Sequence, residues 1–263
     1  MLVSELRKLA DQLESSLRLR TRPVGLRLFE RAADMKGVKS REFAPVVTLC
    51  QVMTASRVFG WTIHATKQGL FPLCSYISGL SDHVPEKLLS AYGEVWFKNK
   101  EDGFEKFASI PHIPSDYEGL IVSPLAAERI EPDLILIFGT PAQMMRIINA
   151  LQWEHYERFQ MFSVGETACA DSLAQAYISK KPAITIPCFG ERRFGHVQDD
   201  EMIAVLPLES VERLSMGLEA MDKAGIRYPI PYYGIQSDLI KGMPPEYLRA
   251  ISTSPATSAV PQD

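Results

Sequence analysis

Residues 131–151 read EPDLILIFGTPAQMMRIINAL. The run at 132–139 is apolar enough to predict a strand at the centre of a sheet that is buried on both faces. Pro141 follows, and proline is favoured in the first turn of a helix, so we expect a helix to begin there. A buried strand that passes directly into a helix is typical of an α/β fold.

Strand and helix patterns also alternate on both sides of this stretch. The sequence predicts strands at 23–30, 61–65, 119–126, 183–188 and 201–207, and helices at 48–59, 85–105, 166–180 and 208–225. No linker rich in proline, glycine or serine interrupts residues 20–245. We therefore expect a single α/β domain whose mixed or parallel sheet is flanked by helices.

The two ends of the chain differ in character from this α/β domain, which we expect over residues 20–247. Leucines recur every three or four positions through residues 1–22, which predicts an N-terminal amphipathic helix that ends at Arg22-Pro23. The leucine stripe has two possible partners, the domain itself or a second subunit, so a homo-oligomer stays open. Residues 248–263 are small and polar, and we expect a disordered tail there.

Composition narrows the classes of partner. The chain has 263 residues, 46% of them hydrophobic, and a net charge of −4, which argues against nucleic acid as a partner. The absence of a long apolar run and of a signal-peptide pattern argues against a membrane partner and predicts a cytoplasmic protein. In that compartment thiols stay reduced, so the four cysteines are expected to be free, catalytic or metal-binding.

Two helix–strand units of the chain resemble each other. In each unit a cysteine stands near the start of a helix, a strand follows, and a second cysteine comes after the strand. The cysteines are Cys50 and Cys74 in the first unit, 24 positions apart, and Cys169 and Cys188 in the second, 19 positions apart. This repetition predicts two pseudo-symmetric halves that arose by duplication.

The residues alone leave several interpretations of the four cysteines open. Their number suits a [4Fe–4S] cluster, and helix N-termini favour the thiolate form that a metal needs. No C-x₂-C pair is present, however, although compact cluster and zinc sites usually contain one. Small buried hydrophobic residues, a zinc site and a single catalytic thiol are the alternatives.

Three other residues are candidates for binding a substrate. Arg192 lies in a glycine-bracketed turn after Cys188 and offers a guanidinium fork to an anion. Gln143 is expected in the first helical turn after a central strand, where α/β sheets usually bind ligands. His64 follows a β-branched strand and is a candidate to reach the four-cysteine site. Each also fits a solvated or purely structural role.

A family resemblance adds to this interpretation. The chain resembles the domain of unknown function 169 family, bacterial and archaeal proteins often found in anaerobes, over about residues 20–225. The similar segments, in order, are RPVGLRL, LCQVMTASRVFG, FPLCSYISGL, EPDLILIFGTPAQMMRIINAL, TACADSLAQAY, KPAITIPCFGERRFG and DDEMIAVLP. In that family cysteines recur at the positions of Cys50, Cys74, Cys169 and Cys188. The resemblance implies a shared metal site, with [4Fe–4S] ahead of zinc, but it implies no particular reaction.

We therefore expect an iron–sulfur protein that holds one [4Fe–4S] cluster through its four cysteines. If it is an enzyme, it is expected to be an oxidoreductase or a lyase or isomerase that acts on a small anionic carboxylate, or to exchange electrons with a redox partner protein. The alternatives are a metal-free enzyme that depends on one cysteine, and a non-catalytic accessory module with structural zinc.

Overall fold

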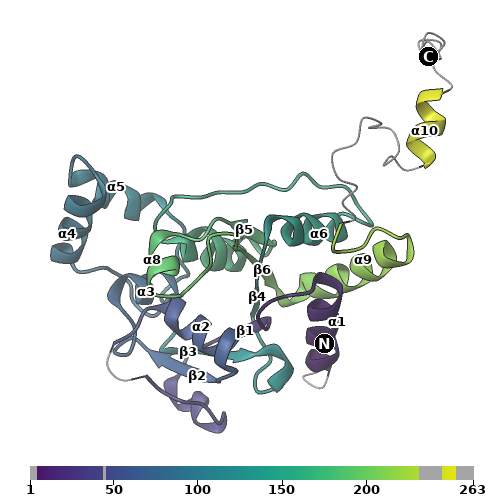
Figure 1. The fold of residues 1–263 in the computed structure, drawn as a ribbon. Helices are drawn as coiled ribbons and strands as arrows, with labels where there is room; N and C mark the ends of the chain where they lie inside the picture. Colours follow the sequence, from purple (N-terminus) through teal and green to yellow (C-terminus); the bar gives the residue numbers. More distant parts are fainter. Residues whose placement is uncertain (1–4, 44–45, 231–244, 253–263) are drawn as a thin grey trace. The chain divides into compact units, whose positions relative to one another are not determined.

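The computed structural model describes residues 5–43, 46–230 and 245–252 (Figure 1). Residues up to Pro229 form one compact unit, and the chain from Ile230 onward forms a second, smaller one. In the second unit the structure describes helix α10, Pro245–Ser252. Residues 248–252 of the predicted tail are therefore helical, whereas 253–263 lie outside the described residues.

A six-stranded sheet forms the centre of the first unit, with the strand order β2-β3-β1-β4-β6-β5. The strands are β1 (Val24–Phe29), β2 (Ile63–Thr66), β3 (Gly119–Pro124), β4 (Leu134–Gly139), β5 (Ala183–Thr185) and β6 (Met202–Pro207). Every neighbouring pair in this sheet is antiparallel. The α/β class and the flanking helices are confirmed, but the sheet is antiparallel and not mixed or parallel.

The apolar run of β4 is compatible with either strand direction. All six of its residues are buried, because helices cover both faces of the sheet. A strand buried on both faces has a continuous apolar sequence whatever the direction of its neighbours. The pattern therefore reports burial, and strand direction depends on connections that the run itself does not encode.

The helices fall on the two faces of the sheet (Figure 1). On one face lie α1 (Leu6–Leu17), α6 (Pro141–Leu151) and α9 (Val211–Lys223). On the other lie α2 (Leu49–Phe59), α3 (Pro72–Ile77), α5 (Glu101–Ser109), a π-helical turn at Ala170–Ala174 and α7 (Gln175–Ser179). The remaining helices are α4 (Glu86–Trp96) and α8 (Phe189–Arg193), with short 3₁₀ turns at Ala32–Gly37, Leu125–Ala127 and Leu208–Ser210.

The N-terminal helix is shorter than the predicted 1–22 and packs on the first unit. Leu6, Leu9, Leu13 and Leu17 are buried in the same core cluster as α6 and α9. The stripe of leucines is thus satisfied within the chain. Among the residues that the structure describes, no helix is long and apolar enough to cross a membrane.

The two halves of the sheet have the same topology and register, as the paired cysteine units predict. In the first half, β1 pairs with β3 from Val24↔Pro124 to Phe29↔Gly119. In the second half, β4 pairs with β6 over the same six-residue length, from Leu134↔Pro207 to Gly139↔Met202. Strands β2 and β5 then take the two edges, and β1 meets β4 in an antiparallel pair at the centre. A pseudo-twofold axis between β1 and β4 relates these halves.

Two predicted elements differ locally from the structure. The helix expected at 85–105 is an α-helical hairpin of α4 and α5. Gly93 and Gly103 let its two helices touch, because a Cβ on Gly103 would lie 2.8 Å from the Gly93 Cα. The helix expected at 166–180 begins with the π-helical turn, a feature that is frequent at functional sites.

Candidate functional site

The four cysteines line one cavity of about 380 Å³. Cys50 and Cys74 come from the first half of the fold, and Cys169 and Cys188 come from the second. All four are free thiols; Cys188 is buried and the other three are partly buried. The structure thus brings together the four residues that the sequence singled out.

The first half supplies its thiols from two adjacent helices. Cys50 is the second residue of α2, and its Sγ is 3.0 Å from the Oγ1 of Thr48, the residue that caps this helix. The Cys74 Sγ in α3 accepts a hydrogen bond from the backbone N–H of Leu49 at 3.4 Å. The Cys50 thiol also lies 3.6 Å from the carbonyl oxygen of Gly190, which belongs to the second half.

The second half supplies its thiols at helix starts. Cys169 is the residue that precedes the π-helical turn, and Cys188 is the N-cap of α8. The Cys188 Sγ accepts hydrogen bonds from the backbone N–H groups of Glu191 and Ala168. Backbone donors therefore already point at sulfur atoms of both halves, an arrangement that stabilises negative charge on sulfur.

The thiols are held in their neutral form by their surroundings. Burial raises the pKa of all four, to about 11 for Cys74 and well above the ordinary range for Cys169. Neighbouring cysteines add to the effect for Cys50, Cys74 and Cys169, and Glu191 adds to it for Cys188. A bound metal reverses this balance, because its positive charge stabilises thiolates. Metal binding at this site would therefore release protons.

Two carboxyl groups share the cavity with the thiols. Glu191 is only 3% exposed; its Oε2 accepts the backbone N–H of Cys188 at 3.2 Å, while its Oε1 has no hydrogen-bond partner. Burial raises the pKa of Glu191 to about 7. Glu166 also lines the cavity, burial raises its pKa, and its Oε1 likewise has no partner.

Lys106 of α5 anchors the segment that leads to Cys169. Its ammonium group donates hydrogen bonds to the Glu166 carbonyl oxygen and the Thr167 Oγ1, both at 3.1 Å, and to the Tyr92 hydroxyl. Thr167 has a φ of 62°, a backbone conformation that few non-glycine residues adopt. Burial lowers the pKa of Lys106 to about 8. The hairpin and the cysteine segment are thus joined by one partly buried amine.

The mouth of the cavity is apolar and aromatic. Trp96 of α4 meets Phe189 of α8 edge to face, with ring centroids 5.3 Å apart. Phe71, Val95 and Phe194 also line the cavity and are exposed. Such a cluster of exposed apolar side chains is typical of a binding site and rare elsewhere on a protein surface.

Arg192 does not line this cavity. Its guanidinium donates to the carbonyl oxygen of Gln198 at 2.5 Å and lies 3.9 Å from the Asp199 carboxylate. The side chain therefore holds the turn after α8, and its predicted role in binding an anion has no support from its position.

Gln143 and His64 lie outside the lining of the cavity as well. The Gln143 amide donates to the carbonyl oxygens of Leu17 and Arg18, at 2.7 and 3.1 Å, and so joins α6 to the end of α1. His64 lies on the edge strand β2, where its Nδ1 is 2.9 Å from the Ser40 hydroxyl. Both side chains are thus engaged in structural contacts.

Several residues of the site were not singled out by the sequence analysis: Tyr92, Trp96, Lys106, Glu166 and Glu191. A signal for Glu191 exists, because it stands three positions after the N-cap Cys188, the spacing of a capping box. The residues of the α4–α5 hairpin have no comparable motif, and only the tertiary fold brings them to the cysteines.

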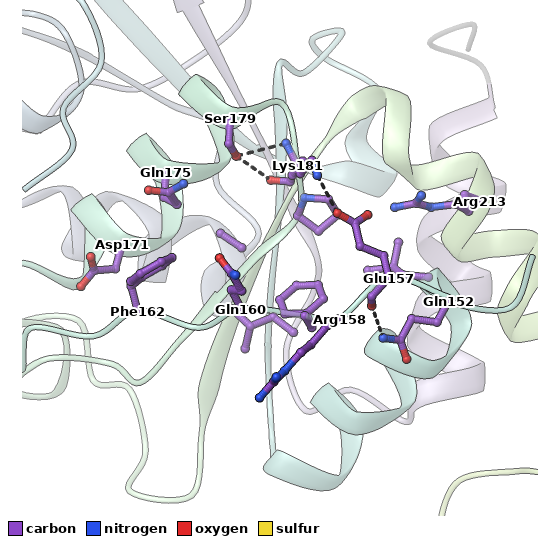
Figure 2. Close-up of a pocket in the computed structure, with 15 residues that line it drawn as sticks. Gln152, Glu157, Arg158, Gln160, Phe162, Asp171, Gln175, Ser179, Lys181 and Arg213 are labelled. Carbon is purple, nitrogen blue, oxygen red and sulfur yellow. Dashed lines mark hydrogen bonds and ion pairs between the residues drawn. The ribbon is translucent and has the colours of Figure 1, made fainter. Parts of the chain in front are cut away.

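A second cavity lies beside the edge strand β5 (Figure 2). Figure 2 shows Lys181 and Glu157 facing each other, and their ion pair is 2.5 Å long. Asp171 accepts the backbone N–H of Val164 at 2.9 Å. The described residues that line this cavity include no cysteine, so the cysteine cavity is the stronger candidate for the predicted metal site.

In the described parts of the chain, no three Cys, His, Asp or Glu side chains converge at the spacing of a single metal ion. The donor set of the cysteine cavity nevertheless matches a cluster in kind, since four thiols are the usual ligands of [4Fe–4S]. The backbone N–H groups that already donate to Cys74 and Cys188 fit the same use.

Comparison with known proteins places the chain in a family. The model of the domain of unknown function 169 family, described as uncharacterised ArCR, matches residues 12–217. The uncharacterized protein MJ0308 of Methanocaldococcus jannaschii is 26% identical over 179 residues, which cover 65% of this chain and 75% of that protein. No solved structure matches the chain. Because the family model covers most of the sequence, the chain belongs to the domain of unknown function 169 family.

Proposed function

We propose that the protein binds one [4Fe–4S] cluster in the cavity, with Cys50, Cys74, Cys169 and Cys188 as its ligands. The observation that carries this proposal is the meeting of all four thiols, two from each pseudo-symmetric half, on one cavity. Four thiols also meet the full ligand requirement of a cubane cluster without help from another chain.

The residues around the thiols have defined tasks in this proposal. Leu49, Ala168 and Glu191 donate backbone N–H groups to sulfur atoms and so offset negative charge there. The apolar walls limit access of water. A cluster with four cysteine ligands supplies one-electron transfer, whereas a cluster with an open iron supplies Lewis-acid chemistry for a lyase or isomerase.

Complete cysteine ligation favours the redox alternative, an iron–sulfur oxidoreductase or electron carrier that works with a redox partner protein. Because all four cysteines are free thiols, we also propose a reducing, cytoplasmic setting for the chain. A metal-free enzyme with one nucleophilic cysteine is the weaker candidate. Burial raises the pKa of every thiol, and a raised pKa lowers the fraction of reactive thiolate.

The test is a set of four single Cys→Ser variants purified without oxygen, with iron, sulfide and zinc measured per chain. Met53→Leu is the matched control, because Met53 lines the same cavity and leucine keeps its volume while all four cysteines stay in place. We expect each serine variant to lose most of the iron and sulfide and the control to keep both. Iron loss confined to one serine variant, or stoichiometric zinc in place of iron, would contradict the proposal.

A further inference from the structure

We propose that the cysteine cavity also binds a neutral, apolar ring compound that carries an O–H or N–H donor. This inference rests on the proposed function, which places a [4Fe–4S] cluster at the thiols. It adds the class of small molecule that lies against that cluster. A neutral ring compound takes the place of the small anionic carboxylate that the sequence predicts as a substrate.

The size and the walls of the cavity suit such a ligand. The cavity has a volume of about 380 Å³ and is shared by the cluster at the thiols and the ring at the aromatic side, so the ligand is limited to a compact ring system. The inner wall is formed mostly by apolar side chains, among them Leu49, Met53, Leu73 and Leu88. Burial of a ring against such a wall is favourable because it removes apolar surface from water.

The mouth provides faces and edges for an aromatic ring. Trp96 and Phe189 stay 39% and 54% exposed although they contact each other, and Phe194 is 46% exposed. Aromatic rings pack best in offset or edge-to-face geometry, and a further ring can join such a pair. A ligand at this mouth would cover aromatic surface that now faces water.

The charges in the cavity disfavour an anion. Glu166 and Glu191 line it, whereas no lysine, arginine or histidine among the described residues does. The Lys106 ammonium group is engaged with the Tyr92 hydroxyl and two oxygens of the 166–167 segment. A carboxylate ligand would face two carboxyl groups and the thiolates of the proposed cluster without a cation to offset them.

The two carboxyl groups are the reason why we expect the ligand to carry an O–H or N–H hydrogen-bond donor. Within the described part of the chain, the Oε1 atoms of Glu166 and Glu191 have no hydrogen-bond partner, and Glu191 is 3% exposed. A buried acceptor without a partner is unfavourable, and an O–H or N–H on the ligand would satisfy it. A cationic ligand could pair with the same atoms, but it would have to lose its hydration against the apolar wall.

The test uses a matched set of naphthalene derivatives: naphthalene-2-methanol, 2-naphthoate, 2-naphthylmethylammonium and naphthalene itself. Calorimetric titration of the anaerobically purified full chain gives the Kd for each. We expect the alcohol to bind at least about tenfold more tightly than the carboxylate or the ammonium compound, and more tightly than naphthalene. Tightest binding of the carboxylate or the ammonium compound, or no binding of any of the four, would overturn the inference.

Two variants locate the binding. Trp96→Ala is expected to weaken the alcohol about tenfold, because it removes an aromatic wall of the mouth. Trp153→Ala is the control, since Trp153 is also exposed but does not line the cavity. Equal affinities of the two variants would overturn the assignment to this cavity.

Iron is measured in the same preparations: retained iron without ligand binding contradicts this inference alone, and ligand binding without iron contradicts the proposed cluster alone.

Discussion

At Gly195 the two halves of the fold approach each other closely beside the cysteines. A Cβ on Gly195 would lie 2.7 Å from the Glu191 carbonyl oxygen and 2.9 Å from the Cys50 Cβ. The Gly195 carbonyl oxygen also accepts a hydrogen bond from the Thr54 hydroxyl of α2. A side chain here would push the α8 turn away from the Cys50 helix.

The first prediction concerns this contact. Gly195→Ala should lower the free energy of unfolding by about 1–3 kcal/mol, the usual effect of overpacking, and should also lower the iron content. Denaturant unfolding and metal analysis measure the two effects. Gly37→Ala is the control, because a Cβ there meets no atom within 4 Å. Equal stability of the two variants would contradict the close approach.

The second prediction uses the partly buried amine of Lys106, whose pKa is lowered to about 8. Above this pH the folded chain has lost a proton that the unfolded chain keeps up to its ordinary pKa of about 10.4. The free energy of unfolding of the wild type relative to Lys106→Met should therefore rise as the pH increases from about 8 to 10.4. Paired denaturant titrations across this range measure the difference. A difference that stays constant or falls would show that the Lys106 pKa is not lowered.

Among the elements, helix α2 and the turn before β6 are joined by a buried ion pair. Arg57 and Glu201 are 2% and 3% exposed, and their closest atoms are 2.9 Å apart. The same carboxylate accepts the backbone N–H of Gln198 at 2.8 Å. Since α2 contains Cys50 and the turn follows Cys188, this pair fixes one half of the cavity against the other.

The third prediction follows from burial of the pair. Glu201→Leu leaves the Arg57 charge buried and uncompensated, which should cost about 3–5 kcal/mol of stability. Replacing both residues, Arg57→Met with Glu201→Leu, should recover much of this loss. The neighbouring Asp200→Asn is the control, because its ion pair with Arg20 is exposed and should contribute little. A double variant no more stable than Glu201→Leu alone would contradict the explanation.

The helices and strands also show what the sequence could predict. The proline in the first turn of α6, the glycine that ends α2 and the leucine stripe of α1 are local signals, and each predicts its element near its true position. The strand expected at 183–188 ends at Thr185, because pairing with β6 stops there and the chain turns to start α8 at Cys188. Edges of elements depend on partners that a local pattern does not contain.

At the scale of the whole molecule, the repeat is the feature that sequence and structure share most closely. The paired cysteine spacing predicted two related halves, and β1-β3 and β4-β6 have matching registers around a central β1–β4 pair. The antiparallel direction of the sheet could not be predicted, because it depends on how the strands pair within each half and on how β1 meets β4, and neither is encoded in a local apolar pattern.

The same distinction applies to the candidate site. The four cysteines could be singled out because each stands at the boundary of an element, and their common cavity agrees with that interpretation. The aromatic mouth and the contacts of Lys106 could not be predicted from the sequence, because α4 and α5 reach the cysteines only through tertiary packing. Gln143 and Arg192 are candidates for substrate binding by their position in the sequence. In the structure, Gln143 donates a hydrogen bond to the Leu17 carbonyl oxygen and Arg192 donates one to the Gln198 carbonyl oxygen.

The central claim is the four-thiolate cluster, and spectroscopy with composition analysis tests it most directly. The wild-type chain is purified without oxygen, its iron and sulfide are quantified, and an EPR spectrum is recorded after chemical reduction. The proposed site predicts about four iron and four sulfide ions per chain and the EPR signal of a reduced cubane cluster. A colourless protein that contains neither iron nor sulfide, and that cannot be reconstituted with them, would contradict it.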